Sequence, residues 1–197
     1  MQLRFKFRKN LMVIFIVIGL FFLGRQAYVS AEEEVVQVKT FISKDRVHPG
    51  EKFKVAFFVE VNPGWHINAH ELADEFLIPT LLTFEEKDNV ELLEYYYPEP
   101  KLRKFDYSEE ELQIFEDKAI LGALVSVGKD LGLGLHKLKA KLRYQACDHR
   151  SCLPPKTLNF EIDFNVVDAS QETQEINQEI FSKIDFEKGN RLRNLNK

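Results

Sequence analysis

The chain contains two cysteines, Cys147 and Cys152, with four residues between them. Cysteines this close can cycle between a dithiol and a disulfide, because exchange needs one thiolate beside a second sulfur. A disulfide between them closes a loop of about six residues, for which chain entropy gives only about 2 kcal/mol of stabilisation. The neighbouring His149 and Arg150 could favour a thiolate through charge or hydrogen bonds. Spacing alone leaves two interpretations open, a redox couple and a disulfide that locks a hairpin.

Alternating strands flank the cysteines on both sides. Apolar residues occupy every second position from Leu138 to Ala146, and again from Leu158 to Val166, which predicts two half-buried strands. Pro154 and Pro155 prevent the returning strand from starting earlier. Counting on from the first strand places Cys147 on its polar face. We therefore expect the cysteine pair at one end of a hairpin, near the surface and outside the core.

Most of the remaining sequence also favours strands. The clearest alternation runs from Phe53 to Val61 and ends at Pro63-Gly64. Shorter strand patterns lie at Val35–Ile42, Trp65–Ala69, Val90–Tyr97 and Lys118–Val127. Many short strands joined by turns, with no long helical period, predict an all-β fold, an antiparallel β-sandwich.

The N-terminus has the pattern of a secretory signal peptide. A basic start is followed by an apolar run of 14 residues, Leu11 to Gly24, which is shorter than the roughly 20 residues that span a bilayer. The small residues of Val29-Ser30-Ala31 predict cleavage after Ala31. The protein is then exported to a compartment where disulfides persist. An uncleaved N-terminal anchor is the alternative.

We expect residues 32–168 to form one globular domain and residues 169–197 a polar tail. In that tail Ile176, Ile180 and Ile184 recur every four residues, which indicates a short, weakly amphipathic helix or a flexible end. The first 31 residues hold five of the 27 basic residues and none of the 31 acidic ones, so the rest carries a net charge of −9. Such a charge argues against nucleic acid as a partner.

The histidines suggest a different function. Cys147, His149 and Cys152 lie within six residues of one another, and His66 and His70 supply two more imidazoles. Together they could form a soft-metal site for copper(I) or zinc, but the spacing matches no familiar metal motif. We expect neither a metal nor any other cofactor. The sequence also lacks the signatures of hydrolytic triads and phosphate-binding loops.

Two segments resemble a known family. Tyr144-Gln145-Ala146-Cys147 followed by Cys152-Leu153-Pro154-Pro155 is similar to the active-site hairpin of the N-terminal periplasmic domain of DsbD, the thiol:disulfide interchange protein. There a Tyr-Gln-Gly-Cys segment leads to a Cys-x-Pro-Pro segment. Pro63 to Asn68 resembles the glycine-aromatic strand of the family's substrate-facing surface, and the order of strands matches from about Val35 to Val167.

The resemblance implies an immunoglobulin-like sandwich with thiol–disulfide oxidoreductase activity. The cysteine pair would take electrons from a membrane donor and pass them to periplasmic thioredoxin-like proteins. Following the family, Cys147 would form the mixed disulfide and Cys152 would resolve it, so a Cys152→Ser variant would trap a partner. Five further residues would support the site, namely Tyr144, Gln145, His149, Pro154 and His66.

The family also shields its cysteines with a short aromatic loop that opens when the partner docks. Phe105, Asp106 and Tyr107 occupy the corresponding stretch and are the candidates for that cap, although an aromatic pair simply packed on a loop is equally compatible with the sequence. The chain departs from the family in two respects. Its cysteine spacing is one residue shorter, and we expect it to lack the membrane and C-terminal thioredoxin-like domains.

From this we expect a monomeric stand-alone domain whose electron donor is a separate membrane protein. The family's electrons serve disulfide correction, cytochrome c maturation or peroxide defence, and the residues select none of these. A non-enzymatic binding module with a structural disulfide is the main alternative function.

Overall fold

The computed structural model describes residues 34–72 and 76–185. The expected signal peptide, residues 1–31, and the end of the expected tail, residues 186–197, lie outside these ranges. Within the described ranges, no helix is long and apolar enough to cross a membrane.

Strands make up about half of the described chain. They are β1 (Val36–Ile42), β2 (Lys52–Val61), β3 (His66–Asn68), β4 (Leu81–Phe84), β5 (Val90–Tyr96), β6 (Lys101–Arg103), β7 (Leu112–Glu116), β8 (Lys118–Val127), β9 (Gly134–Tyr144), β10 (Ala146–Cys147) and β11 (Lys156–Val166), followed by the short helix α2 (Gln178–Phe181).

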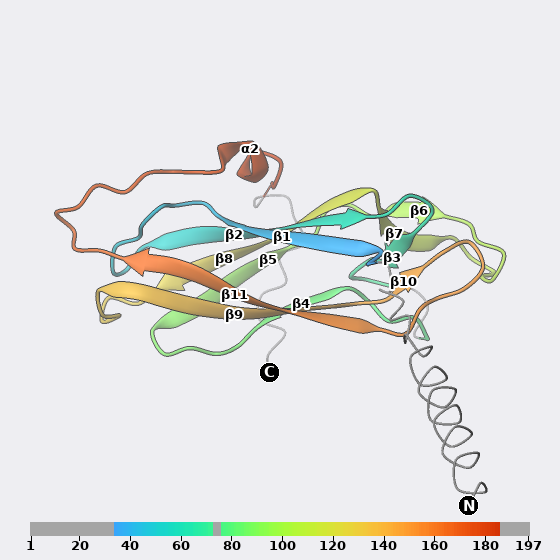
Figure 1. Ribbon diagram of the computed structural model, residues 1–197, viewed down its shortest axis with the longest axis horizontal. Coiled ribbons are helices and arrows are strands. Elements are labelled where there is room, and N and C mark those ends of the chain that lie inside the picture. The colour runs from blue at the N-terminus through green and yellow to red at the C-terminus, as the bar shows by residue number, and fades with distance from the viewer. Residues whose placement is uncertain (1–33, 73–75, 186–197) are drawn as a thin grey trace, which may run out of the picture. The chain divides into compact units, whose positions relative to one another are not determined.

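These strands form three antiparallel sheets. One has the order β1-β2-β8-β5 and a second the order β11-β9-β4 (Figure 1). The third, with the order β10-β3-β7-β6, is called the end sheet below. The expected immunoglobulin-like antiparallel β-sandwich is confirmed.

One core joins the facing sheets. The alternation read from β2 holds, because Phe53, Val55, Phe57, Val59 and Val61 are all buried. Across the sandwich their rings meet those of β11: Phe53 lies 5.2 Å from Phe164 and Phe57 lies 5.3 Å from Phe160, centroid to centroid. Each fully buried side chain of this size contributes about 1.5–3 kcal/mol. The sandwich therefore has a core that does not depend on the cysteines.

The strand pattern failed in one place that matters for function. The first cysteine-flanking strand was expected to continue to Ala146, but β9 ends at Tyr144 and the chain changes sheets at Gln145. Four short strands, β4, β6, β7 and β10, were not predicted. All have five residues or fewer, too short to show a period.

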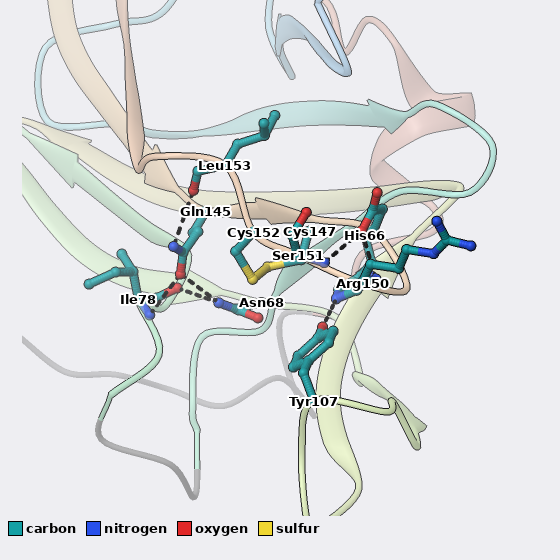
Figure 2. Close-up of a disulfide and its surroundings, with 11 residues drawn as sticks. His66, Asn68, Ile78, Tyr107, Gln145, Cys147, Arg150, Ser151, Cys152 and Leu153 are labelled. Carbon is teal, nitrogen blue, oxygen red and sulfur yellow. Dashed lines mark hydrogen bonds between the residues drawn. A yellow bond between two sulfur atoms is a disulfide. The ribbon is translucent and has the colours of Figure 1, made fainter.

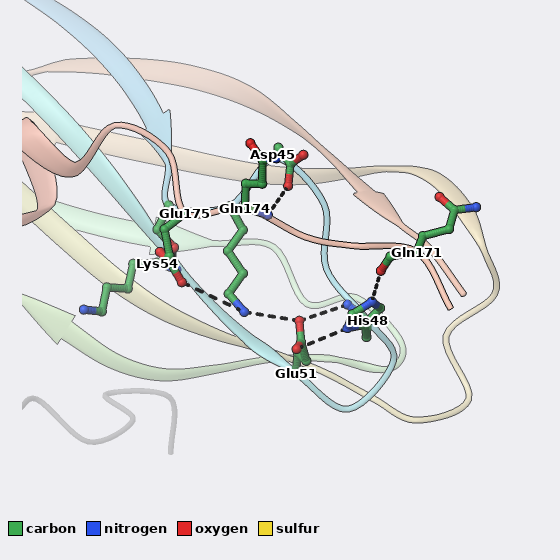
Figure 3. Close-up of polar contacts among 9 residues, drawn as sticks. Asp45, His48, Glu51, Lys54, Gln171, Gln174 and Glu175 are labelled. Carbon is green, nitrogen blue, oxygen red and sulfur yellow. Dashed lines mark hydrogen bonds and ion pairs between the residues drawn. The ribbon is translucent and has the colours of Figure 1, made fainter. Parts of the chain in front are cut away.

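The C-terminal segment lies along the edge of the sandwich and is held there by backbone bonds. Ile176 N–H donates to the Ser43 carbonyl over 2.8 Å, and Asp45 N–H donates to the Gln174 carbonyl over 3.1 Å. Gln174 N–H also donates to Asp45 Oδ1 over 2.7 Å (Figure 3). The expected helix is reduced to the four residues of α2. Its last residue, Phe181, and the following Ile184 pack with Ala56 of β2 in a small buried cluster.

Candidate functional site

Both cysteines lie in the segment that joins β9 to β11, as expected, and Cys147 also belongs to β10 of the end sheet. β10 pairs with β3 so that Ala146 faces Ile67 and Cys147 faces His66. Ala146 and Ile67 are part of the core. Because side chains alternate along a strand, Cys147 and His66 must lie on the opposite face of this sheet.

The expectation that Cys147 is near the surface is wrong. Its exposed fraction is 0%, whereas Cys152 is partly exposed. The parity count itself holds, because Ala146 packs into the core and Cys147 lies on the other face. The assumption that this other face is open to solvent fails, because Cys147 lies opposite His66, which is itself buried.

Cys147 and Cys152 form a disulfide across two short antiparallel segments (Figure 2). Asp148 N–H donates to the Ser151 carbonyl over 2.9 Å, and Leu153 N–H donates to the Ala146 carbonyl over 2.8 Å. These bonds flank the cysteines, so the pair occupies a non-hydrogen-bonded position, where facing side chains approach most closely.

The turn between the cysteines is closed by Asp148. Its Oδ1 accepts the backbone N–H groups of Arg150 and Ser151, both over 2.7 Å. These two bonds hold the pKa of the Asp148 carboxyl below its usual value. The turn therefore carries a fixed negative charge beside the disulfide.

Gln145 ties together three segments at the base of this turn. Its Nε2 donates to the Leu153 carbonyl over 3.2 Å, and its Oε1 accepts from Ile78 N–H over 3.4 Å and from Asn68 Nδ2 over 3.5 Å (Figure 2). Gln145 thus positions the chain on both sides of the cysteines. Asn68 was not predicted as a site residue, and its buried Oδ1 has no hydrogen-bond partner among the described protein atoms.

Two of the three cap candidates lie on His66. The ring of Phe105 stacks on the imidazole with 4.3 Å between centroids, and the Tyr107 hydroxyl lies 3.1 Å from His66 Nε2. Phe105 and Tyr107 also stack on each other at 5.3 Å. Asp106 is exposed. The loop therefore covers the residue that faces Cys147 across the strands.

Burial sets the protonation of the groups under this loop. Burial lowers the pKa of His66, and the nearby Glu116 and Asp148 only partly oppose it. Burial, with help from Asp148, raises the pKa of Tyr107 to about 12. At neutral pH the site therefore holds a neutral imidazole beside a protonated phenol.

The other predicted site residues are dispersed. Tyr144 is buried at the end of β9, whereas His149 and Pro154 are exposed on the turn and after it. His70, considered for a metal site, stacks on Tyr97 at 4.0 Å and contacts the Thr80 carbonyl through Nδ1. Within residues 34–72 and 76–185, no group of three or more His, Cys, Asp or Glu side chains could hold a metal ion.

A surface hollow of about 610 Å³ lies beside the cap loop. Apolar side chains of Leu72, Phe76 and Leu77 line part of it, and the rest is formed by residues 107–113, including Glu109, Glu110 and Glu111.

Comparison with known proteins gives one family match. The family described as "Thiol:disulfide interchange protein DsbD, N-terminal" matches residues 32–163. Among solved structures, the N-terminal periplasmic domain of ScsB from Proteus mirabilis is similar, with 14% identity and a TM-score of 0.47 over 68% of this chain and 48% of that one. The chain thus spans about half of that structure's chain. No curated protein matches.

Proposed function

We propose, from the premise that the chain belongs to the DsbD N-terminal family, that Cys147 and Cys152 are a redox couple exchanging electrons with thioredoxin-like proteins. The observation that carries this proposal is the disulfide itself, which lies within the segment that the family match covers and next to His66, on which Phe105 stacks.

A purely structural role fits the disulfide less well. The core is continuous without it, and the turn that it closes is already held by Asp148 and Gln145. A loop of about six residues adds only about 2 kcal/mol when cross-linked. The full burial of Cys147 is the one observation that favours a structural disulfide.

We infer different roles for the two sulfurs from their exposure, the reverse of those that the family resemblance implied. Exchange needs a clear approach to the sulfur that is attacked, and Cys152 is the partly exposed one. A partner thiolate therefore attacks Cys152 Sγ, and the bond to Cys147 breaks. Cys147 leaves with the electron pair as a thiolate, and a mixed disulfide joins Cys152 to the partner.

The hollow beside the cap supports docking of a partner at this end. Apolar side chains and a run of three glutamates lie next to the loop that must open. We propose export to the periplasm, with a separate membrane protein as electron donor and a thioredoxin-like protein as acceptor.

Redox titration against glutathione, read by alkylation and mass shift, tests the function. The pair should titrate in the range of thioredoxin-like relays, whereas a potential far below about −300 mV indicates a structural bond. Trapping then tests the order of the sulfurs. Cys147→Ser should accumulate a mixed disulfide with a thioredoxin-like protein through Cys152, and Cys152→Ser should trap much less.

Failure to trap a partner with either variant, together with a pair that stays oxidised under strong thioredoxin reduction, would reject the redox function. The structural alternative predicts instead that replacing both cysteines by serine mainly lowers the melting temperature.

A further inference from the structure

A thiol, an imidazole and a carboxylate form a row across the end sheet. Cys147 of β10 faces His66 of β3, and His66 faces Glu116 of β7 in the same register. The neighbouring row, Ala146, Ile67 and Phe115, packs into the core, so the first row must share the opposite face. Facing residues of antiparallel strands have their Cβ atoms about 5 Å apart, so the imidazole and the cysteine sulfur extend from neighbouring positions on the same face of the sheet.

A thiol next to an imidazole, with a carboxylate beyond it, is an arrangement that can activate a nucleophile. A thiol is a weak nucleophile until a base takes its proton, and the base works best when a third group orients it. Here the thiol of reduced Cys147, the imidazole of His66 and the carboxylate of Glu116 come from three successive strands of one sheet. We propose, building on the redox function above, that His66 accepts the proton of Cys147 when the reduced pair closes onto a mixed disulfide.

The step balances in atoms and electrons. The partner disulfide is first attacked by the Cys152 thiolate, which gives a mixed disulfide and one partner thiolate. Cys147 Sγ–H then passes its proton to the imidazole, and the new thiolate attacks Cys152 Sγ. The Cys147–Cys152 bond forms, and the second partner sulfur leaves as a thiolate that takes the proton from the imidazolium, while the first partner thiolate is protonated by solvent. The partner disulfide is reduced to a dithiol and the cysteine pair is oxidised.

The surroundings of His66 suit this task. Because burial lowers its pKa, the imidazole is neutral and ready to accept a proton at neutral pH. Phe105 stacks on the ring, and the Tyr107 hydroxyl is hydrogen-bonded to Nε2, so the ring orientation is fixed. The imidazolium that forms is stabilised by two carboxylates, Glu116 from β7 and Asp148 from the turn.

Glu116 does not act with its full charge. Arg103 Nη2 lies 2.6 Å and Lys101 Nζ 3.1 Å from its Oε1, and both come from β6. These two cations weaken the attraction between Glu116 and a protonated His66. Glu116 therefore raises the proton affinity of the imidazole only in part, so the protonated His66 can release its proton again.

The test is the reaction of the reduced protein with dithiobis(nitrobenzoate), followed by stopped-flow absorbance. Attack by Cys152 releases the first thionitrobenzoate, and ring closure by Cys147 releases the second. His66→Gln should slow the second phase by about tenfold or more at pH 7 and leave the first phase nearly unchanged. The deficit should shrink toward pH 9, where hydroxide deprotonates the thiol directly.

His70→Gln is the matched control, because His70 is also partly buried, stacked on an aromatic ring and lowered in pKa. It should leave both phases unchanged. If His66→Gln itself folds poorly, Glu116→Gln at its partly exposed position should still slow the second phase by a few fold.

An unchanged second phase in both variants overturns the inference, as does a deficit that is the same at every pH or that also appears in His70→Gln. The reagent is not a protein partner. These results therefore stand apart from titration and trapping, on which the redox function itself depends.

Discussion

Two histidines lie at opposite ends of the β9–β11 ladder, and their pKa values are shifted in opposite directions. His48 lies beside Val47, which bridges to Val166 at one end, and His66 lies beside the cysteines at the other. The hydrogen bond to the Gln171 carbonyl, supported by Glu51, raises the pKa of His48. Burial lowers the pKa of His66.

The surroundings explain the difference. His48 Nε2 lies 2.8 Å from the Gln171 carbonyl, and Nδ1 lies 3.2 Å from Glu51 Oε1 (Figure 3). Both contacts stabilise the protonated form of the ring. His66 is buried, with the Phe105 ring stacked on it and the Tyr107 hydroxyl beside Nε2. The first histidine can therefore fasten the C-terminal segment as a cation, and the second can exchange a proton.

The largest difference between the two ends should appear in redox chemistry. Replacing both Cys147 and Cys152 by alanine should abolish thiol–disulfide exchange and lower the free energy of unfolding by about 2 kcal/mol. His48→Gln should leave exchange intact. Insulin reduction and urea unfolding measure the two effects, and a cysteine-free protein that still reduces insulin would contradict the comparison.

The C-terminal segment should matter for stability and not for exchange. Phe181 is 9% exposed and packs on Ala56, so Phe181→Ala should lower the free energy of unfolding by up to about 3 kcal/mol. Exchange rates with dithiobis(nitrobenzoate) should not change. A marked change in those rates would show that the two ends are coupled.

The two histidines should make the free energy of unfolding depend on pH in opposite ways. The contribution of His48, whose folded pKa is raised, is fully present below its unfolded value of about 6.5 and is lost as pH rises through the folded value. For His66, whose folded pKa is lowered, protonation of the unfolded chain weakens the fold as pH falls through about 6.5.

Relative to wild type, His48→Gln should therefore be most destabilising near pH 5 and His66→Gln least destabilising there. Urea unfolding between about pH 5 and pH 8 measures both variants. Parallel curves for the two would mean that the histidines share one kind of environment.

The smallest expected effect concerns the cap. Tyr107→Phe removes one hydrogen bond to His66 but keeps the ring contact with Phe105, so the free energy of unfolding should fall by only about 0.5–1 kcal/mol. The loop should open more often, and Cys152 should react faster with small disulfides by a few fold. Equal or slower reaction would argue against a cap.

Much of the site was visible in local sequence. The spacing of Cys147 and Cys152 and the Tyr-Gln-Ala and Leu-Pro-Pro segments beside them indicated the redox pair and its family. His66, Phe105 and Tyr107 were named through the same resemblance. Asn68, Glu116 and the acidic lining of the hollow were missed, because nothing in their own neighbourhoods connects them with residue 147.

The sequence by itself determined the sandwich, the longer strands and the cysteine pair, because alternation and close spacing are local properties of the chain. Only the tertiary structure decided that Cys147 is buried, that it faces His66, and that the cap loop lies on that histidine. Each of these depends on which strands pair and in what register. Those pairings join residues about 40 to 80 positions apart, and the contacts that fix them carry no signal in any single window of sequence.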